Sequence, residues 1–183
     1  MWICFIIGGL VIAMGIVLLT GRGAFLVAGY NTASKAEKAK YDEKKLCRNV
    51  GKIVLPAGVL TIALGVVIAI GMQEARVEVT DTNVKIGGMY GLTVEFSEIT
   101  DIQLIESSMK TIGTGVRTNG IGGIGEVNKG YFRTTHYGDA MLFVMVNSSP
   151  TIRIVRDERD VFISFSDSEA TRALYEELMA KRT

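Results

Sequence analysis

The sequence predicts an α+β membrane protein, in which an N-terminal transmembrane hairpin precedes a β-rich domain that a C-terminal helix closes. Three observations predict this class. Two long stretches, 2–19 and 53–72, contain no charged residue. From residue 76 onward, short segments alternate apolar and polar side chains, which is the period of half-buried strands. The segment from residue 166 returns to helical spacing. The expected domains are therefore 1–72 and 73–183.

The first apolar stretch predicts a helix over about 2–20. It contains neither charge nor proline, and at about 1.5 Å per residue a helix of this length spans roughly the 30 Å hydrocarbon core of a bilayer. The alternative is a cleaved secretory signal peptide, which needs a basic segment before a shorter apolar run. No Lys or Arg precedes the run, so a retained span is favoured.

The second apolar stretch predicts a helix over about 50–72. Residues 53–72 carry no charge, and Pro56 is expected within the first turns, where it disturbs few hydrogen bonds. A basic loop, 21–49, connects the two helices. Its segment GAFLVAG, residues 23–29, is too short to cross a bilayer and is interpreted as an interfacial or re-entrant stretch.

Glycines recur at intervals of seven in both apolar stretches. Seven residues are close to two helical turns, so each set lies on one helix face. Small residues allow close approach of helix backbones in lipid, where no hydrophobic drive brings helices together. The pattern predicts close packing within an antiparallel hairpin, with a dimer seam or the general abundance of glycine in membrane helices as alternatives. The helix-packing candidates are Gly8, Gly15, Gly51, Gly58 and Gly65.

The charges are distributed unevenly, although the whole chain has a formal net charge of only +1. Residues 21–52 have a net charge of +5, and residues 73–183 have a net charge of −4. Short basic loops remain in the cytoplasm, so the loop is expected inside and the C-terminal domain outside. Ser34 and Glu37 have the spacing of a capping box, which predicts a helix in the loop. Its basic residues are expected to be solvated or attracted to anionic headgroups.

The amino-acid sequence of the loop also resembles that of a known family. AGYNTASKAEKAKYDEKKLCR between two apolar spans resembles a bacterial family of small two-helix membrane proteins of unknown function, with its AGYNT, KYD and KLCR segments. The resemblance covers roughly residues 1–72. It implies a multi-pass protein of the bacterial cell membrane and implies no chemistry.

The C-terminal domain is expected to contain seven to nine short strands. The clearest are 76–80, 84–86, 92–96, 102–105, 141–146, 151–155 and 161–165, with glycine-rich turns between some of them. Many short strands at close spacing favour a small β-barrel or sandwich. Ser166 and Glu169 form a second potential capping box before a helix that should flank or plug the sheet.

Three segments of this domain carry a second resemblance. VEVTDTNVKIGGMYGLTVEFSEI, GVRTNGIGG and ISFSDSEATRALYEEL resemble bacterial pleckstrin-homology-like domains, which are often tethered to membranes. The resemblance covers about residues 75–180 and implies a β-barrel or sandwich with a closing C-terminal helix. It also implies protein or ligand binding, without identifying a site.

Catalysis is not indicated by any arrangement of residues. Gly120-Ile-Gly-Gly-Ile-Gly125 matches G-x-G-x-x-G, but a turn and a strand are expected after it rather than a helix that faces a pyrophosphate. His136 is the only histidine and has no expected metal-ligand partner. We therefore expect no enzymatic activity, no cofactor, no metal site and no nucleic-acid partner.

Recognition is expected around the glycine-rich segment, because loops on a rigid scaffold tend to carry binding groups. The candidates are Arg117, Asn119, Lys129, Tyr131 and Arg133. The predicted function is a membrane-anchored, non-enzymatic binding module whose partners are the lipid bilayer and an unknown protein or further copies of itself. The alternative is a small membrane sensor or immunity-type protein that acts through its transmembrane hairpin.

Overall fold

The computed structural model describes residues 2–123 and 125–182. The chain divides into two compact units, residues 1–69 and 70–183. The first contains the helical hairpin, and the second contains all of the described strands and the C-terminal helix.

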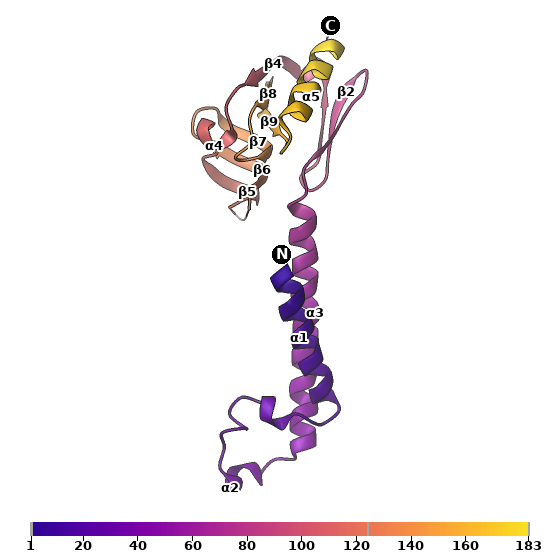
Figure 1. Cartoon of the computed structure of the whole chain (residues 1–183), viewed down its shortest axis with the longest axis vertical. Coiled ribbons are helices and arrows are strands. Elements are labelled where there is room, and N and C mark those ends of the chain that lie inside the picture. Colours follow the sequence, from indigo (N-terminus) through magenta and orange to yellow (C-terminus); the bar gives the residue numbers. More distant parts are fainter. Residues whose placement is uncertain (1, 124, 183) are drawn as a thin grey trace. The chain divides into compact units, whose positions relative to one another are not determined.

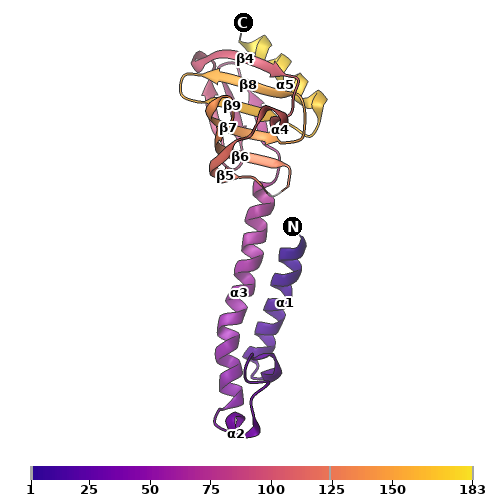
Figure 2. The same cartoon turned by 90° about the vertical axis from the view of Figure 1, so that its left-hand side faces the viewer.

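Two helices, α1 (Trp2–Leu19) and α3 (Glu43–Gly71), are long and apolar enough to cross a membrane. They run side by side in opposite directions (Figures 1 and 2). Their large apolar side chains point mostly outward: Trp2 is 80% exposed and Ile53 is 74% exposed. The helices are thus not covered by protein in the way that the core helices of a soluble domain are.

The five spaced glycines lie where the two helices meet. A Cβ built on Gly8 would come within 3.1 Å of the carbonyl oxygen of Gly58, and one built on Gly58 within 3.0 Å of that of Gly8. At the other end of the interface, a Cβ on Gly51 would lie 3.1 Å from the carbonyl oxygen of Gly15. Glycine thus faces glycine at two levels, and Gly65 faces Cys4 at a third. The contacts are between α1 and α3 of one chain, as in the hairpin alternative.

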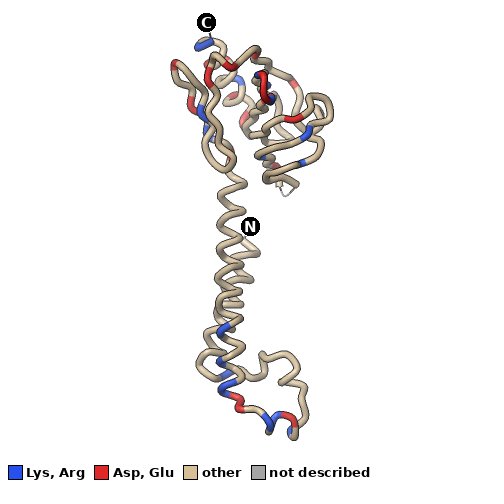
Figure 3. Tube along the Cα trace, turned by 180° about the vertical axis from the view of Figure 1, so that it is seen from behind, with Lys and Arg blue, Asp and Glu red and all other residues tan. Residues whose placement is uncertain are grey.

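The loop between the helices is ordered. A short 3-10 helix, η1 (Ala24–Leu26), is followed by α2 (Lys35–Lys38), where the capping box of Ser34 and Glu37 is confirmed. Val27 of the loop is buried with Leu18 of α1 and Cys47 of α3, so a small apolar core joins the loop to both helices. Lys and Arg gather in this loop and in the first turns of α3 (Figure 3).

The second helix begins earlier than the sequence pattern indicated. The side chain of Asp42 accepts a hydrogen bond of 3.1 Å from the backbone N–H of Lys45 and thereby caps the start of α3. Because α3 begins at Glu43, Pro56 lies in the helix interior. The expectation that Pro56 lies within the first turns is therefore wrong. The charged turns from Glu43 to Lys52 extend the same helix beyond its apolar part.

The described residues of the second unit form nine strands. They are β1 (Arg76–Val79), β2 (Asn83–Gly87), β3 (Leu92–Glu95), β4 (Ile99–Ile105), β5 (Val116–Ile121), β6 (Val127–Thr134), β7 (Gly138–Met145), β8 (Thr151–Arg156) and β9 (Asp160–Ser164). A short 3-10 helix, η2 (Phe96–Glu98), precedes β4, α4 (Met109–Ile112) follows it, and α5 (Ser168–Lys181) ends the unit.

The strands form two separate sheets. The smaller has the order β1-β2-β3, and the larger has the order β4-β8-β9-β7-β6-β5. All pairs are antiparallel except β7 with β9. No strand pairing joins the sheets within residues 2–123 and 125–182, so the barrel alternative is wrong. Each sheet keeps two free edges, and β5 is one edge of the larger sheet.

Both faces of the larger sheet are buried near its centre. Met141 and Phe143 of β7 belong to a core shared with the smaller sheet and with Leu174 and Leu178 of α5. The intervening Leu142 belongs to a second core on the other face, which includes residues of α4. Burial on both faces explains why β7 is continuously apolar from residue 140 to residue 145. The N-cap of α5 is Asp167, which accepts from the backbone N–H of Glu169, so the predicted Ser166–Glu169 capping box is wrong.

Candidate functional site

The hairpin of β5 and β6 has an irregular register that determines its shape. A bulge at Thr118 shifts the pairing, so that Asn119 faces Tyr131 and Gly120 faces Gly130. The two glycine backbones approach closely, since a Cβ on Gly130 would lie 2.5 Å from the carbonyl oxygen of Asn119. Gly130 also has a φ of 109°, which side-chain-bearing residues rarely adopt. The bulge and this close pair place the side chains of Asn119 and Tyr131 beside each other on one face of the edge.

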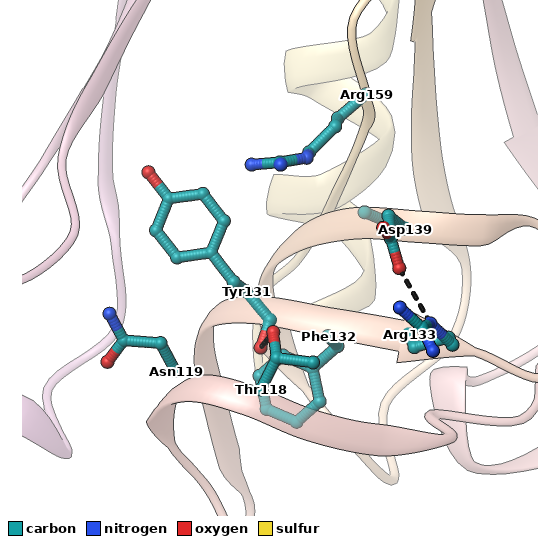
Figure 4. A pocket seen from close by; sticks show the side chains of 8 residues that line it. Thr118, Asn119, Tyr131, Phe132, Arg133, Asp139 and Arg159 are labelled. Carbon is teal, nitrogen blue, oxygen red and sulfur yellow. Dashed lines mark hydrogen bonds and ion pairs between the residues drawn. The ribbon is translucent and has the colours of Figure 1, made fainter.

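A cavity of about 400 Å³ opens beside this hairpin (Figure 4). Residues from three strands and one turn line it: Thr118, Asn119, Tyr131, Phe132, Arg133, Asp139, Ala140 and Arg159. The volume is within the range of small-molecule sites, which combine apolar walls with a few polar groups. The ring of Tyr131 provides apolar surface, whereas the side chains of Phe132 and Ala140 pack in the core on the other face of the sheet.

Tyr90, in the turn between β2 and β3, reaches the rim of this cavity. Its hydroxyl donates a hydrogen bond of 3.3 Å to Oδ1 of Asn119. Its ring meets the ring of Tyr131 edge to face, with centroids 6.4 Å apart, and lies over Gly130, which leaves room for it. The backbone of Tyr90 has a φ of 65°, a strained conformation for an aromatic residue that often accompanies functional sites.

Two arginines line the cavity, and they differ in whether a carboxylate of the described residues pairs with them. Arg133 donates from Nε to Asp139 at 3.0 Å, and Figure 4 shows this pair on one side of the cavity. Arg159 extends from the turn between β8 and β9, and its guanidinium lies 5.3 Å from the centroid of the Tyr131 ring. It forms no ion pair with any residue in the described part of the chain. The cavity therefore has one neutralised cation and one free cation.

The structure brings three of the five predicted recognition residues together. Asn119, Tyr131 and Arg133 line the cavity. Arg117 does not: its Nη1 donates to the carbonyl oxygen of Gly122 at 2.6 Å and helps close the hairpin. All five lie on β5 and β6 rather than on a long loop, because the strands continue up to Ile121 and resume at Val127.

Lys129 is the other predicted residue that lies outside this cavity. Its side chain is only 1% exposed, and its Nζ donates to the backbone carbonyl oxygen of Gln73. Burial lowers the pKa of Lys129, and the nearby carboxylate of Glu74 partly offsets that effect. Lys129 thus anchors the first residues of the second unit to β6 and is not available as a surface recognition group.

The sequence pattern did not identify Tyr90, Asp139 or Arg159 as site residues. Arg159 lies in the segment 157–160, whose mixture of acidic and basic residues is typical of a solvated turn. Tyr90 follows two glycines in a turn of the smaller sheet, far from the hairpin in sequence. Tyr90 reaches β6 only through the packing of the two sheets, so no local signal could have found it. Asp139 lies opposite Arg133 in the pairing of β6 with β7, and Arg159 lies in the β8–β9 turn of the same sheet.

Comparison with known proteins identifies a family match in the N-terminal part of the chain. Residues 5–84 match the family described as Domain of unknown function (DUF3784). The matched segment contains the two apolar helices and extends into β2, in agreement with the resemblance of the hairpin to a two-helix family of unknown function. No curated protein and no solved structure matches the chain. The pleckstrin-homology-like resemblance of the second unit stays a prediction.

Metal-binding side chains do not cluster in the described residues: no group of three or more His, Cys, Asp or Glu side chains could hold an ion there. His136 is exposed in the turn between β6 and β7. Cys4 and Cys47 are both free thiols in the first unit. The groups gathered at the cavity are hydrogen-bond donors, aromatic rings and guanidinium groups, and this chemistry is suited to recognition.

Proposed function

We propose that the chain is a membrane-anchored, non-enzymatic binding module of the bacterial cell membrane, which recognises its partner through the cavity beside β5 and β6. The observation that carries the proposal is the 400 Å³ cavity with polar and aromatic walls. The resemblance to tethered pleckstrin-homology-like domains supports the binding role, and the DUF3784 match is consistent with a shared hairpin rather than a shared chemistry.

The bilayer is the proposed environment of α1 and α3. Their outward side chains are apolar. Exposing this apolar surface to water would cost about 25 cal/mol of free energy per Å². Close glycine contacts between the helices suit a medium in which packing, not the hydrophobic effect, holds helices together. The basic loop is proposed to face the cytoplasm, and the second unit the opposite side.

Membrane location and orientation are tested together in intact cells that produce the full chain with a C-terminal tag. We expect the protein to remain in the membrane fraction after alkaline carbonate extraction. We also expect added proteinase to remove the tag without permeabilisation. A control tag inserted between Asn31 and Thr32 in the loop should be protected. Recovery in the soluble fraction would contradict the anchor, and protection of the C-terminal tag alone would reverse the orientation.

The binding role is tested by placing a photoreactive amino acid in the cavity of the full chain. Thr118 lines the cavity with an exposed side chain, whereas Glu176 lies exposed on α5 and is the matched control. We expect illumination of living cells to give a discrete adduct at position 118, detected by mass spectrometry. Tyr131→Ala should remove that adduct. Equal labelling at 118 and 176, or labelling that Tyr131→Ala leaves unchanged, would contradict binding at the cavity.

A further inference from the structure

We infer that the cavity binds an organic carboxylate, with the guanidinium of Arg159 as its principal anchor. This inference rests on the proposed function, because it names the ligand class of the same site. It is carried by the charge balance of the cavity, by the directions of its hydrogen-bond donors and by its mixture of polar and apolar walls.

The charge balance depends on how the acidic residues near Arg159 are engaged. Asp160 lies 2.6 Å from Nη2 of Arg153, and Glu158 lies 3.8 Å from Nη2 of Arg156. These contacts engage Asp160 and Glu158 with other arginines, and no ion pair joins Arg159 to Asp157, the third acid of the turn, in the described part of the chain. Arg159 is left as the one cation of the cavity that the described residues do not pair.

Arg159 is also held in place before any ligand arrives. Its guanidinium lies over the ring of Tyr131 at 5.3 Å, a cation–π arrangement. Its backbone carbonyl oxygen accepts a hydrogen bond of 2.8 Å from Nε of Arg156, which fixes the turn. A guanidinium with free donors in a defined position is suited to bidentate binding of a planar carboxylate.

The remaining polar groups present donors to the same space. Oδ1 of Asn119 is occupied by the hydroxyl of Tyr90, so the amide NH₂ of Asn119 is left to donate. In Figure 4 this amide and the ring of Tyr131 lie on the same side of the cavity, and the guanidinium of Arg159 extends toward that ring. The hydroxyl of Tyr131 has no partner within the described residues. A donor-rich lining requires a ligand with acceptor oxygens.

The net charge selects a monoanion. Arg133 and Arg159 contribute two positive charges, and Asp139 contributes one negative charge. A single carboxylate neutralises the lining, whereas a phosphate dianion would leave an excess negative charge beside Asp139. The volume and the ring of Tyr131 accommodate an organic body attached to that group.

The test uses the full chain in micelles of a zwitterionic detergent, with N-acetylphenylalanine as the probe. Its C-terminal amide is the neutral counterpart, and phenyl phosphate is the dianionic one. We expect the carboxylate to bind at least tenfold more tightly than the amide, and more tightly than the phosphate, by ligand-observed NMR. Arg159→Gln should weaken carboxylate binding about tenfold, consistent with the loss of a charged hydrogen-bond donor.

Lys85→Gln is the matched control, because Lys85 is exposed on β2 and lies outside the cavity. It makes the same change in net charge and should leave binding unchanged. Equal affinity for acid and amide, preference for the phosphate, no binding up to the solubility limit of the probe, or equal effects of the two substitutions would overturn the inference. A photoadduct at position 118 together with such a result would leave the binding function standing and reject only the carboxylate.

Discussion

Gly15→Leu is expected to separate α1 from α3, whereas Gly9→Leu should leave the hairpin intact. A Cβ on Gly15 would lie 2.8 Å from the backbone N and Cα of Leu55, so a larger side chain must push the backbones apart. Gly9 has nothing within 4 Å of the equivalent position. Overpacking of this kind costs about 1–3 kcal/mol, and the loss of close contact along the helices adds to that cost. Both substitutions increase apolarity, so neither should impair insertion.

Proximity of the helices can be measured by a disulfide. A Cβ on Gly65 would lie 2.9 Å from the Cβ of Cys4, and disulfides need about 3.5–4.5 Å, so a small outward adjustment allows a bond after Gly65→Cys. Mild oxidation should give a crosslink within one chain, visible as altered monomer mobility in a Cys47→Ala background. Gly15→Leu should reduce its formation about tenfold or more, and Gly9→Leu should not. Crosslinked dimers from Gly65→Cys would instead support the dimer seam, and equal effects at positions 9 and 15 would contradict the glycine contact.

Periodicity made the helices and many of the strands predictable. Uncharged stretches indicated both long helices, and alternating patterns indicated strands such as β2 and β8. The start of α3 was less predictable, because its first turns are charged and only the cap at Asp42 marks the boundary. The sequence pattern did not indicate β5 (VRTNGI) either. This strand lies at the exposed edge of the sheet, its register is interrupted by a bulge, and it contains a glycine. Glycine is a poor indicator of strands unless its partner across the ladder is known.

The candidate site was only partly predictable for a different reason. Neighbours in sequence identified Asn119, Tyr131 and Arg133, because all three flank the glycine-rich turn. Lys129 and Arg133 carry similar charges in the same strand, but Lys129 is buried whereas Arg133 is exposed. Both point to the same face of β6, so which of them is exposed depends on what covers that face at each position along the strand. That cover comes from Gln73 and from the turn that contains Tyr90, both distant in sequence.

Lys129→Ala is expected to destabilise the second unit by about 2–4 kcal/mol. Truncation of a fully buried side chain leaves a cavity, and the carbonyl oxygen of Gln73 loses the Nζ donor that it now accepts from. Lys129→Met fills most of the same volume and should cost less. The measurement is a urea titration of the full chain in detergent, followed by proteolysis of the sheet unit. Lys85→Ala on the exposed face of β2 is the control and should change stability little.

The pH dependence of the stability of these variants tests whether burial penalises the charged form of Lys129. Burial lowers its pKa in the folded state, so the unfolded chain binds more protons between the folded pKa and the ordinary value of about 10.5. Stability should therefore rise with pH across that interval in the native chain relative to Lys129→Met, and the difference should level off above it. Glu74 and Arg76 line the same space, but they are present in both chains, so the difference isolates Lys129. If the difference in stability between the native chain and Lys129→Met does not change with pH, or falls as pH rises, burial does not penalise the Lys129 ammonium.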